Sequence, residues 1–160
     1  MADVDLNDVA AVLTAFDPVR PSRRRRTRAD AERWIVWNKR NYADHGFGLW
    51  IIEAHDGRFV GDCGLTIQDV EGAPFVEVGY HVHPTLRSQG LATEAAAAVR
   101  DAAKSADVKH VVAIIRPDNL PSQRVAEKIG LHLEREVHKN GGPALIFGAD
   151  LRSDELRQIQ

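Results

Sequence analysis

The sequence predicts a mixed α/β (α+β) fold, in which helices flank a single sheet. Residues 75–83 alternate between apolar and polar side chains, as in a strand with one buried face. Residues 108–115 are almost continuously apolar, which is typical of a strand covered on both faces. Between them, residues 90–103 place apolar side chains at helical spacing. The residues expected inside are Val76, Val78, Tyr80 and Val82 on the strand, and Leu91, Ala95, Val99 and Ala102 on the helix.

Two helices are expected ahead of the first strand. Residues 5–13 have the spacing of a short amphipathic helix with one apolar side, formed by Leu6, Val9, Val12 and Leu13. A second helix begins near Thr27 or Asp30, after the basic run of residues 23–28. It is expected to carry three large side chains inward: Trp34, Ile35 and Trp37.

Hairpins account for most of the remaining chain. A strand at residues 47–53 turns back at residues 55–58, where Asp-Gly supplies a left-handed conformation. The returning strand alternates Phe59, Gly61, Cys63, Leu65 and Ile67, and another turn follows at residues 71–74. A helix at residues 121–128 stops at Gly130. Residues 131–138 and 144–151 form a last hairpin, so that the order after the two helices is β-β-β-α-β-α-β-β within one domain, residues 1–160.

The composition fits a soluble, cytoplasmic enzyme, as it fits many other globular proteins. The chain has 160 residues, of which 44% are hydrophobic and 28% charged, with a formal net charge of −2. This balance disfavours a dedicated nucleic-acid or membrane partner. The single cysteine, Cys63, excludes an intramolecular disulfide and suits a reducing compartment. Composition leaves the oligomeric state open between monomer and homodimer.

A short polar turn between the two predicted strands indicates a phosphate site. Residues 87–95 read Arg-Ser-Gln-Gly-Leu-Ala-Thr-Glu-Ala and lead from a strand into a helix. A helix start presents backbone N–H groups to an anion, and Arg87 adds a charged donor. Gly90 permits close backbone approach. Neither the Walker spacing nor the dinucleotide spacing of glycines occurs here, which excludes those two phosphate loops.

Three segments carry a resemblance to a known family. Residues 87–92, Arg-x-x-Gly-x-Ala, resemble the acetyl-CoA pyrophosphate loop of the GNAT superfamily of N-acetyltransferases. Residues 77–82 resemble the family's fourth strand, and residues 119–131 resemble its closing helix. The closing helix is similar to that of the ribosomal-protein N-terminal (alanine/serine) acetyltransferases. The resemblance covers residues 47–151 and implies a mostly antiparallel mixed sheet with splayed central strands; the family's usual first strand is not evident.

The resemblance also implies an activity, the transfer of acetyl from acetyl-CoA to a primary amine by direct attack. Glu77 is then the first candidate for the general base, through water, and Ser122 for the group that protonates the leaving thiolate. The thiolate-protonating tyrosine of many relatives is missing, because its positions hold Ala126 and Glu127. The implied contacts to acetyl-CoA come from His81, Val82, His83, Arg87, Ser88, Gln89, Gly90, Leu91, Ala92, Thr93, Asn119 and Ser122.

The acceptor and two rival functions stay open at this stage. The acceptor is a protein N-terminal α-amine, or a small molecule such as an antibiotic, polyamine or amino acid. An α-amine with a pKa of about 8 is roughly one-tenth neutral at pH 7, which makes a weak base sufficient. Residues 23–28 could instead mark an RNA-binding module. A non-catalytic CoA-binding module with a degenerate site is a further alternative. His81 and His83 share a strand face, but no further ligands accompany them, so no metal is predicted. His81 could also assist as a base. Cys63 is expected to be a packing residue.

Overall fold

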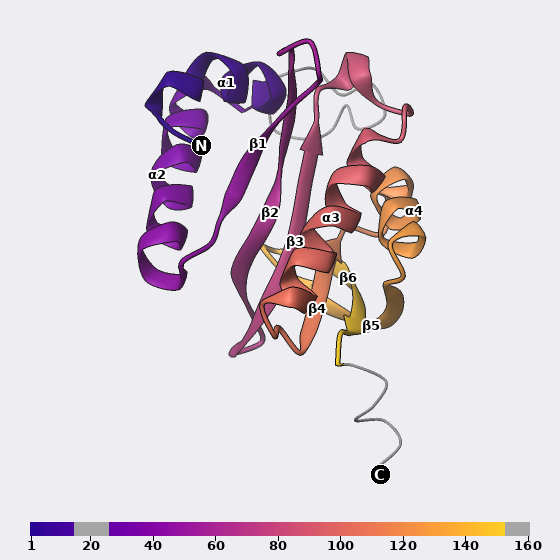
Figure 1. Cartoon of the computed structure of the whole chain (residues 1–160). Coiled ribbons are helices and arrows are strands. Elements are labelled where there is room, and N and C mark those ends of the chain that lie inside the picture. The colour runs from indigo at the N-terminus through magenta and orange to yellow at the C-terminus, as the bar shows by residue number, and fades with distance from the viewer. Residues whose placement is uncertain (15–25, 153–160) are drawn as a thin grey trace. The chain divides into compact units, whose positions relative to one another are not determined.

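The computed structural model describes residues 1–14 and 26–152, and in this part of the chain helices and strands follow the predicted order. The elements are α1 (Leu6–Thr14), α2 (Arg28–His45), β1 (Leu49–Glu53), β2 (Phe59–Val70), β3 (Ala73–Val82), α3 (Leu91–Ser105), β4 (His110–Ile115), α4 (Leu120–Lys128), β5 (His132–Lys139) and β6 (Gly142–Asp150) (Figure 1). The mixed α/β fold class is therefore confirmed. Among these described residues, no helix is both long and apolar enough to span a membrane.

The strands form one sheet in the order β1-β2-β3-β4-β6-β5. β1 with β2, β4 with β6 and β5 with β6 pair antiparallel, whereas β3 and β4 pair in parallel with Glu77 opposite Val112. This confirms the expected mostly antiparallel sheet. The chain divides into two compact units, one of Met1–Gly64 with Tyr80–Ala95, the other of Leu65–Gly79 with Ala96–Gln160.

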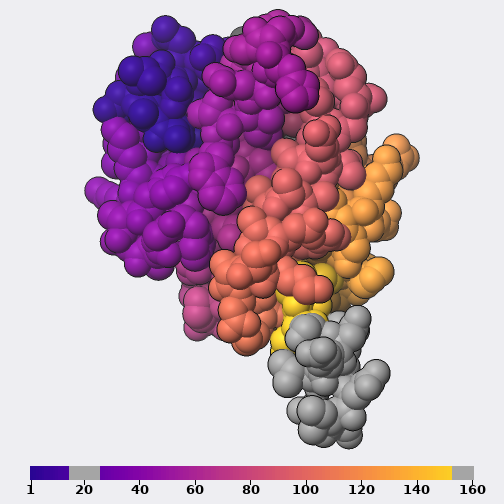
Figure 2. Space-filling model, viewed as in Figure 1, coloured from indigo at the N-terminus to yellow at the C-terminus, as the bar shows by residue number. Residues whose placement is uncertain are grey.

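The first unit contains α1 packed on α2, seen as the indigo and purple surfaces that adjoin in Figure 2. Val9 and Ala10 of α1 are buried against Ala31 and Ile35 of α2. Helix α2 begins at a capping box, in which the Thr27 side chain accepts from the Asp30 N–H and the Asp30 carboxylate accepts from the Thr27 N–H. The start of α2 thus follows the local sequence signal.

A buried amide joins α2 to the edge strand β1. Asn38 is fully buried; its Oδ1 accepts from the Leu49 N–H at 2.6 Å and its Nδ2 donates to the Leu49 carbonyl at 2.9 Å. The side chain therefore bonds both backbone groups of one strand residue, as a neighbouring strand would. Because both groups are buried, the pair holds the helix in register with the strand.

Two glycines of β2 allow neighbouring strands to approach closely. A Cβ atom on Gly61 would lie 1.9 Å from the His81 carbonyl oxygen of β3, and one on Gly64 would lie 2.1 Å from the Gly48 carbonyl oxygen. Both distances are far inside van der Waals contact.

The alternation of buried and exposed side chains expected on β2 is wrong for the central part of this strand. Residues 60–66 are all buried, so both faces of the strand are covered.

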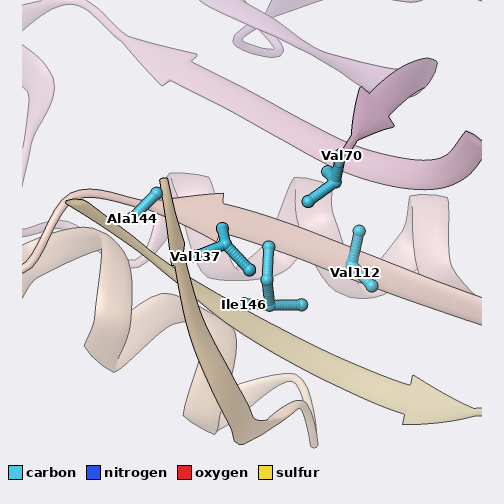
Figure 3. Close-up of a cluster of buried hydrophobic side chains, with 5 residues drawn as sticks. All are labelled: Val70, Val112, Val137, Ala144 and Ile146. Atoms are coloured by element: carbon cyan, nitrogen blue, oxygen red, sulfur yellow. The ribbon is translucent and has the colours of Figure 1, made fainter. Parts of the chain in front are cut away.

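The second unit contains a cluster of buried aliphatic side chains (Figure 3). Val70, Val112 and Ile146 come from three different strands, and Val137 is the inward residue of the otherwise largely exposed β5.

The buried face of α3 differs from the face that the sequence predicts. Val99 is buried as predicted, but Ala102 is exposed and the buried alanines are Ala96 and Ala103. A run of alanines leaves the helical phase unspecified, which explains the error.

The substitution Gly61→Ala is expected to destabilise the protein, because a backbone carbonyl occupies the position of the new methyl group. Overpacking of this kind costs about 1–3 kcal/mol or more. Gly142→Ala is the matched control, since a Cβ atom added there would meet nothing within 4 Å and the φ of Gly142 is not in the left-handed region. Urea unfolding should therefore show a lowered midpoint for Gly61→Ala and a midpoint near wild type for Gly142→Ala. Equal midpoints for Gly61→Ala and wild type would contradict the close approach.

Candidate functional site

The turn before α3 has the geometry of an anion site. Ser88 and Gly90 adopt left-handed conformations, with φ of 62° and 84°. The Glu94 N–H donates to the Gly90 carbonyl at 3.0 Å, the bond that starts the helix. The N–H groups of Leu91, Ala92 and Thr93 precede this bond and have no helical carbonyl one turn back. The local structure thus agrees with a loop that offers backbone donors at the positive end of a helix dipole.

Arg87 links this turn to the end of β3. Its Nε donates to the Val82 carbonyl at 3.2 Å, and its backbone is extended. The residue is exposed, as are Ser88, Gln89 and Gly90. The Arg87 side chain therefore holds the turn to β3 and also places a positive charge at the edge of the turn.

The backbone N–H groups at the end of β3 are not equivalent. The His83 N–H donates to the Val60 carbonyl of β2 at 2.8 Å. Since neighbouring residues of a strand direct their N–H groups to opposite edges, the Val82 N–H points away from β2. Within residues 81–83, the segment that the sequence predicts to contact acetyl-CoA, Val82 is thus the residue whose N–H is directed away from β2.

His81 lies in a polar cluster that the sequence interpretation missed. Its Nδ1 is 2.8 Å from Oδ1 of Asp62, whose side chain is 1% exposed, while 33% of the His81 side chain is exposed. Trp34 of α2 meets the imidazole edge-on, with ring centroids 5.3 Å apart and an interplanar angle of 85°. The available signal was the acidic residue within the apolar stretch of β2, Val60-Gly61-Asp62-Cys63.

Arg26 and a pair of tryptophans adjoin this cluster. The Arg26 guanidinium carbon is 5.3 Å from the Trp34 ring centroid, and Trp34 stands 5.0 Å from Trp37. Burial lowers the pKa of Arg26, while the charges of Asp30 and Asp62 act in the opposite direction. The Trp34 indole N–H is buried and has no hydrogen-bond partner among the described residues. Of the basic run, residues 23–25 lie outside the described residues.

The predicted catalytic residues belong to the second unit. Glu77 accepts a hydrogen bond from the hydroxyl of the buried Thr66 at 3.1 Å. At the start of α4, the Asn119 amide donates to Ser122 Oγ at 2.7 Å and makes no side-chain cap to the helix backbone. Asn119 therefore orients the Ser122 hydroxyl, which a simple capping role would not require.

Cys63 is a packing residue, as the sequence predicts. Its side chain is buried, and burial together with the negative charge of Asp62 raises the thiol pKa to about 12. A thiol in this state supplies almost no thiolate at neutral pH. Within residues 1–14 and 26–152, no three His, Cys, Asp or Glu side chains are grouped to hold a metal ion.

Comparisons with known proteins identify the family. A family model described as an acetyltransferase (GNAT) domain matches residues 1–132. The uncharacterized protein YkkB of Bacillus subtilis is 36% identical over 116 residues, which are 71% of this chain and 67% of YkkB.

Two solved structures share the fold. A protein from Bordetella pertussis described as a GNAT-family acetyltransferase has a TM-score of 0.75 at 21% identity, covering 91% of this chain and 89% of that one. The ribosomal-protein-alanine N-acetyltransferase of Brucella melitensis has a TM-score of 0.70 at 18% identity, covering 94% and 96%. The family match confirms the predicted acyltransferase class and acetyl-CoA as cosubstrate. This chain belongs to the GNAT family of acetyltransferases.

Proposed function

We propose that this chain moves the acetyl group of acetyl-CoA to the α-amine of a peptide N-terminus. The observation that carries the proposal is the turn of residues 87–93, where left-handed Ser88 and Gly90 precede the first turn of α3, whose N–H groups have no helical carbonyl one turn back. A pyrophosphate bound at this turn accepts hydrogen bonds from the backbone N–H groups and pairs with the positive charge of Arg87. In this proposal residues 1–160 form one catalytic domain, and the protein is cytoplasmic.

On the donor side, Val82 is the residue whose backbone N–H stabilises the developing oxyanion or the pantetheine arm. Its support is the direction of that N–H, because the His83 N–H is already engaged with Val60. A fixed backbone donor needs no reorganisation as negative charge develops on the thioester oxygen. In this proposal His81 and His83 contact the donor through their backbone, on either side of Val82.

On the leaving-group side, Ser122 donates a proton to the CoA thiolate. The Asn119 amide donates to Ser122 Oγ, which leaves the hydroxyl hydrogen directed elsewhere. Direct transfer suits the chain, because the buried Cys63 thiol is too weak an acid to form an acyl-enzyme. The transfer therefore proceeds without a covalent enzyme intermediate.

The α-amine acceptor is supported by the closing-helix pattern and by acid–base arithmetic. Asn119 and Ser122 stand where the resemblance to the ribosomal-protein N-terminal enzymes requires them. At pH 7 an α-amine is neutral some hundreds of times more often than a lysine side chain, given pKa values of about 8 and about 10.4.

An acceptor panel tests the choice of an α-amine acceptor. The panel contains peptides that begin with Ala or Ser, their N-blocked forms with an internal lysine, spermidine, and free amino acids. Acetylation of the free N-terminus alone supports the proposal; acetylation of spermidine or an amino acid alone overturns the acceptor, and failure to bind acetyl-CoA overturns the function.

Replacing Arg87 is expected to weaken acetyl-CoA binding. Arg87→Ala removes both a charged donor and the tie to the Val82 carbonyl, so we expect at least about a tenfold rise in the dissociation constant. In thermal unfolding, acetyl-CoA at about 100 times its dissociation constant stabilises wild type by roughly 2.7 kcal/mol. Arg58→Ala is the control, since Arg58 pairs with Asp56 in an exposed turn. Equal acetyl-CoA affinity in wild type and Arg87→Ala would contradict the proposed pyrophosphate contact.

Replacing Ser122 is expected to slow turnover without changing donor binding. Loss of a general acid costs about 10²–10⁴-fold in rate, and Ser122→Ala should fall toward the lower end because water can supply a proton. Ser105→Ala is the control, since its hydroxyl only bonds the Asp101 carbonyl within α3. The measurement is steady-state CoA release together with calorimetric acetyl-CoA affinity. If Ser122→Ala turns over at the wild-type rate, the assignment is wrong.

A further inference from the structure

The residue that removes the proton from the acceptor amine is indicated by the surroundings of His81. We infer that His81 is the catalytic base of the transfer and that the buried Asp62 is its positioning residue. Nε2 of His81 accepts the proton, while Nδ1 stays hydrogen-bonded to Asp62. This inference rests on the proposed acetyl transfer to an amine, and its test separates the two.

The burial of Asp62 is the first argument. A carboxylate that is 1% exposed is costly unless a partner compensates it. Its hydrogen-bonded partner is the imidazole, with Nδ1 and Oδ1 2.8 Å apart. A carboxylate at Nδ1 fixes the tautomer that has its proton on Nδ1, so that Nε2 carries the lone pair. The same carboxylate stabilises the imidazolium that forms when Nε2 takes a proton.

The imidazole is also held in place by its other neighbours. The His81 carbonyl lies against Gly61 so closely that no side chain could be added there. The Trp34 ring packs edge-on against the imidazole from α2. A third of the side chain nevertheless remains exposed, so a substrate can reach it. A fixed but accessible base is the arrangement that proton transfer requires.

The charged groups around the pair come from two directions. Asp62 faces His81 from β2, and Arg26, ahead of α2, lies close enough to interact electrostatically with Asp62. Asp30 of α2 in turn interacts with Arg26, which reduces the net effect of the guanidinium. On β3 itself, His83 is hydrogen-bonded to Thr85. The negative charge nearest to the imidazole is therefore that of Asp62.

The position of His81 in the chain fits the chemistry. It directly precedes Val82, whose N–H is the proposed oxyanion donor. His81 Nε2 takes one proton from the acceptor ammonium, and the neutral amine nitrogen forms a bond to the thioester carbon. The carbon–sulfur bond breaks, the thiolate leaves with the electron pair and takes a proton from the Ser122 hydroxyl, and the second amine proton restores that hydroxyl. His81 then releases its proton to solvent.

Glu77 is the rival base, and its environment is different. It lies in the second unit, and one of its carboxylate oxygens accepts a hydrogen bond from the Thr66 hydroxyl. Imidazole is the side chain that changes its protonation closest to neutral pH, and it therefore suits an amine acceptor better. The substitution Glu77→Gln tests this alternative in the same assay.

The experiment compares three glutamine variants. His81→Gln keeps a donor for Asp62 but cannot accept a proton, so we expect turnover to fall about 10²–10⁴-fold with unchanged calorimetric acetyl-CoA affinity. His110→Gln is the matched control, because His110 also pairs with a carboxylate, Glu134, at 2.7 Å. It should stay within about twofold of wild type. A loss confined to Glu77→Gln, or a loss of acetyl-CoA affinity in His81→Gln, would overturn the inference.

Two further measurements separate a base from a structural role. Imidazole added to His81→Ala should restore part of the turnover, and Asp62→Asn should lower turnover while acetyl-CoA affinity is kept. Nitrogen-15 NMR of the wild-type histidines should show His81 protonated on Nδ1 and bare on Nε2. A proton on Nε2 in the neutral ring overturns the inference even where no acceptor is turned over. A wild type that fails to bind acetyl-CoA overturns instead the proposed function.

Discussion

The close contact between β2 and β3 at Gly61 is the constraint on which the first unit's functional residues depend. A Cβ atom at this position would collide with the His81 carbonyl, so only glycine allows the two backbones to lie as they do. The same approach lets the His83 N–H reach Val60 and leaves the Val82 N–H on the other edge. It also brings the side chain of His81 beside that of Asp62. The absence of a side chain at Gly61 therefore allows both the position of the Val82 N–H and the pairing of His81 with Asp62.

Two adjacent ionisable residues of β2, Asp62 and Cys63, are both buried but differ in their hydrogen-bond partners. Burial and the negative charge of Asp62 raise the thiol pKa of Cys63 to about 12, which keeps the thiol neutral. Asp62 is buried to a similar degree, but a hydrogen-bonded imidazole accompanies it. Desolvation disfavours the charged forms of both residues, and the imidazole is the hydrogen-bond partner that the buried carboxylate needs. A buried carboxylate that is retained beside a partly exposed histidine is more readily explained by function than by stability.

The features that the sequence predicted well are those encoded by neighbouring residues. The turn before α3 follows from a glycine, a polar run and a helix start within a few residues, and α2 begins at a capping box that spans Thr27 to Asp30. The pair of Asp62 with His81 escaped prediction, because it depends on which residues of β2 and β3 face each other across 19 positions of sequence. The inward face of α3 escaped for another reason, since its alanines do not distinguish one helical phase from the next.

This contrast separates the donor side of the reaction from the acceptor side. In the proposed function, donor recognition relies on backbone groups of one continuous turn, so a short sequence pattern is enough to identify the donor site. The groups around His81 come instead from β2, β3, α2 and the segment before α2, and they join an acid, a histidine, an arginine and two tryptophans. Each contact there depends on tertiary packing, so in the proposed reaction substitutions at Arg26 or Trp34 alter the acceptor side while the donor turn is unchanged. The choice of acceptor is therefore expected to change through this cluster, and the use of acetyl-CoA to persist with residues 87–93.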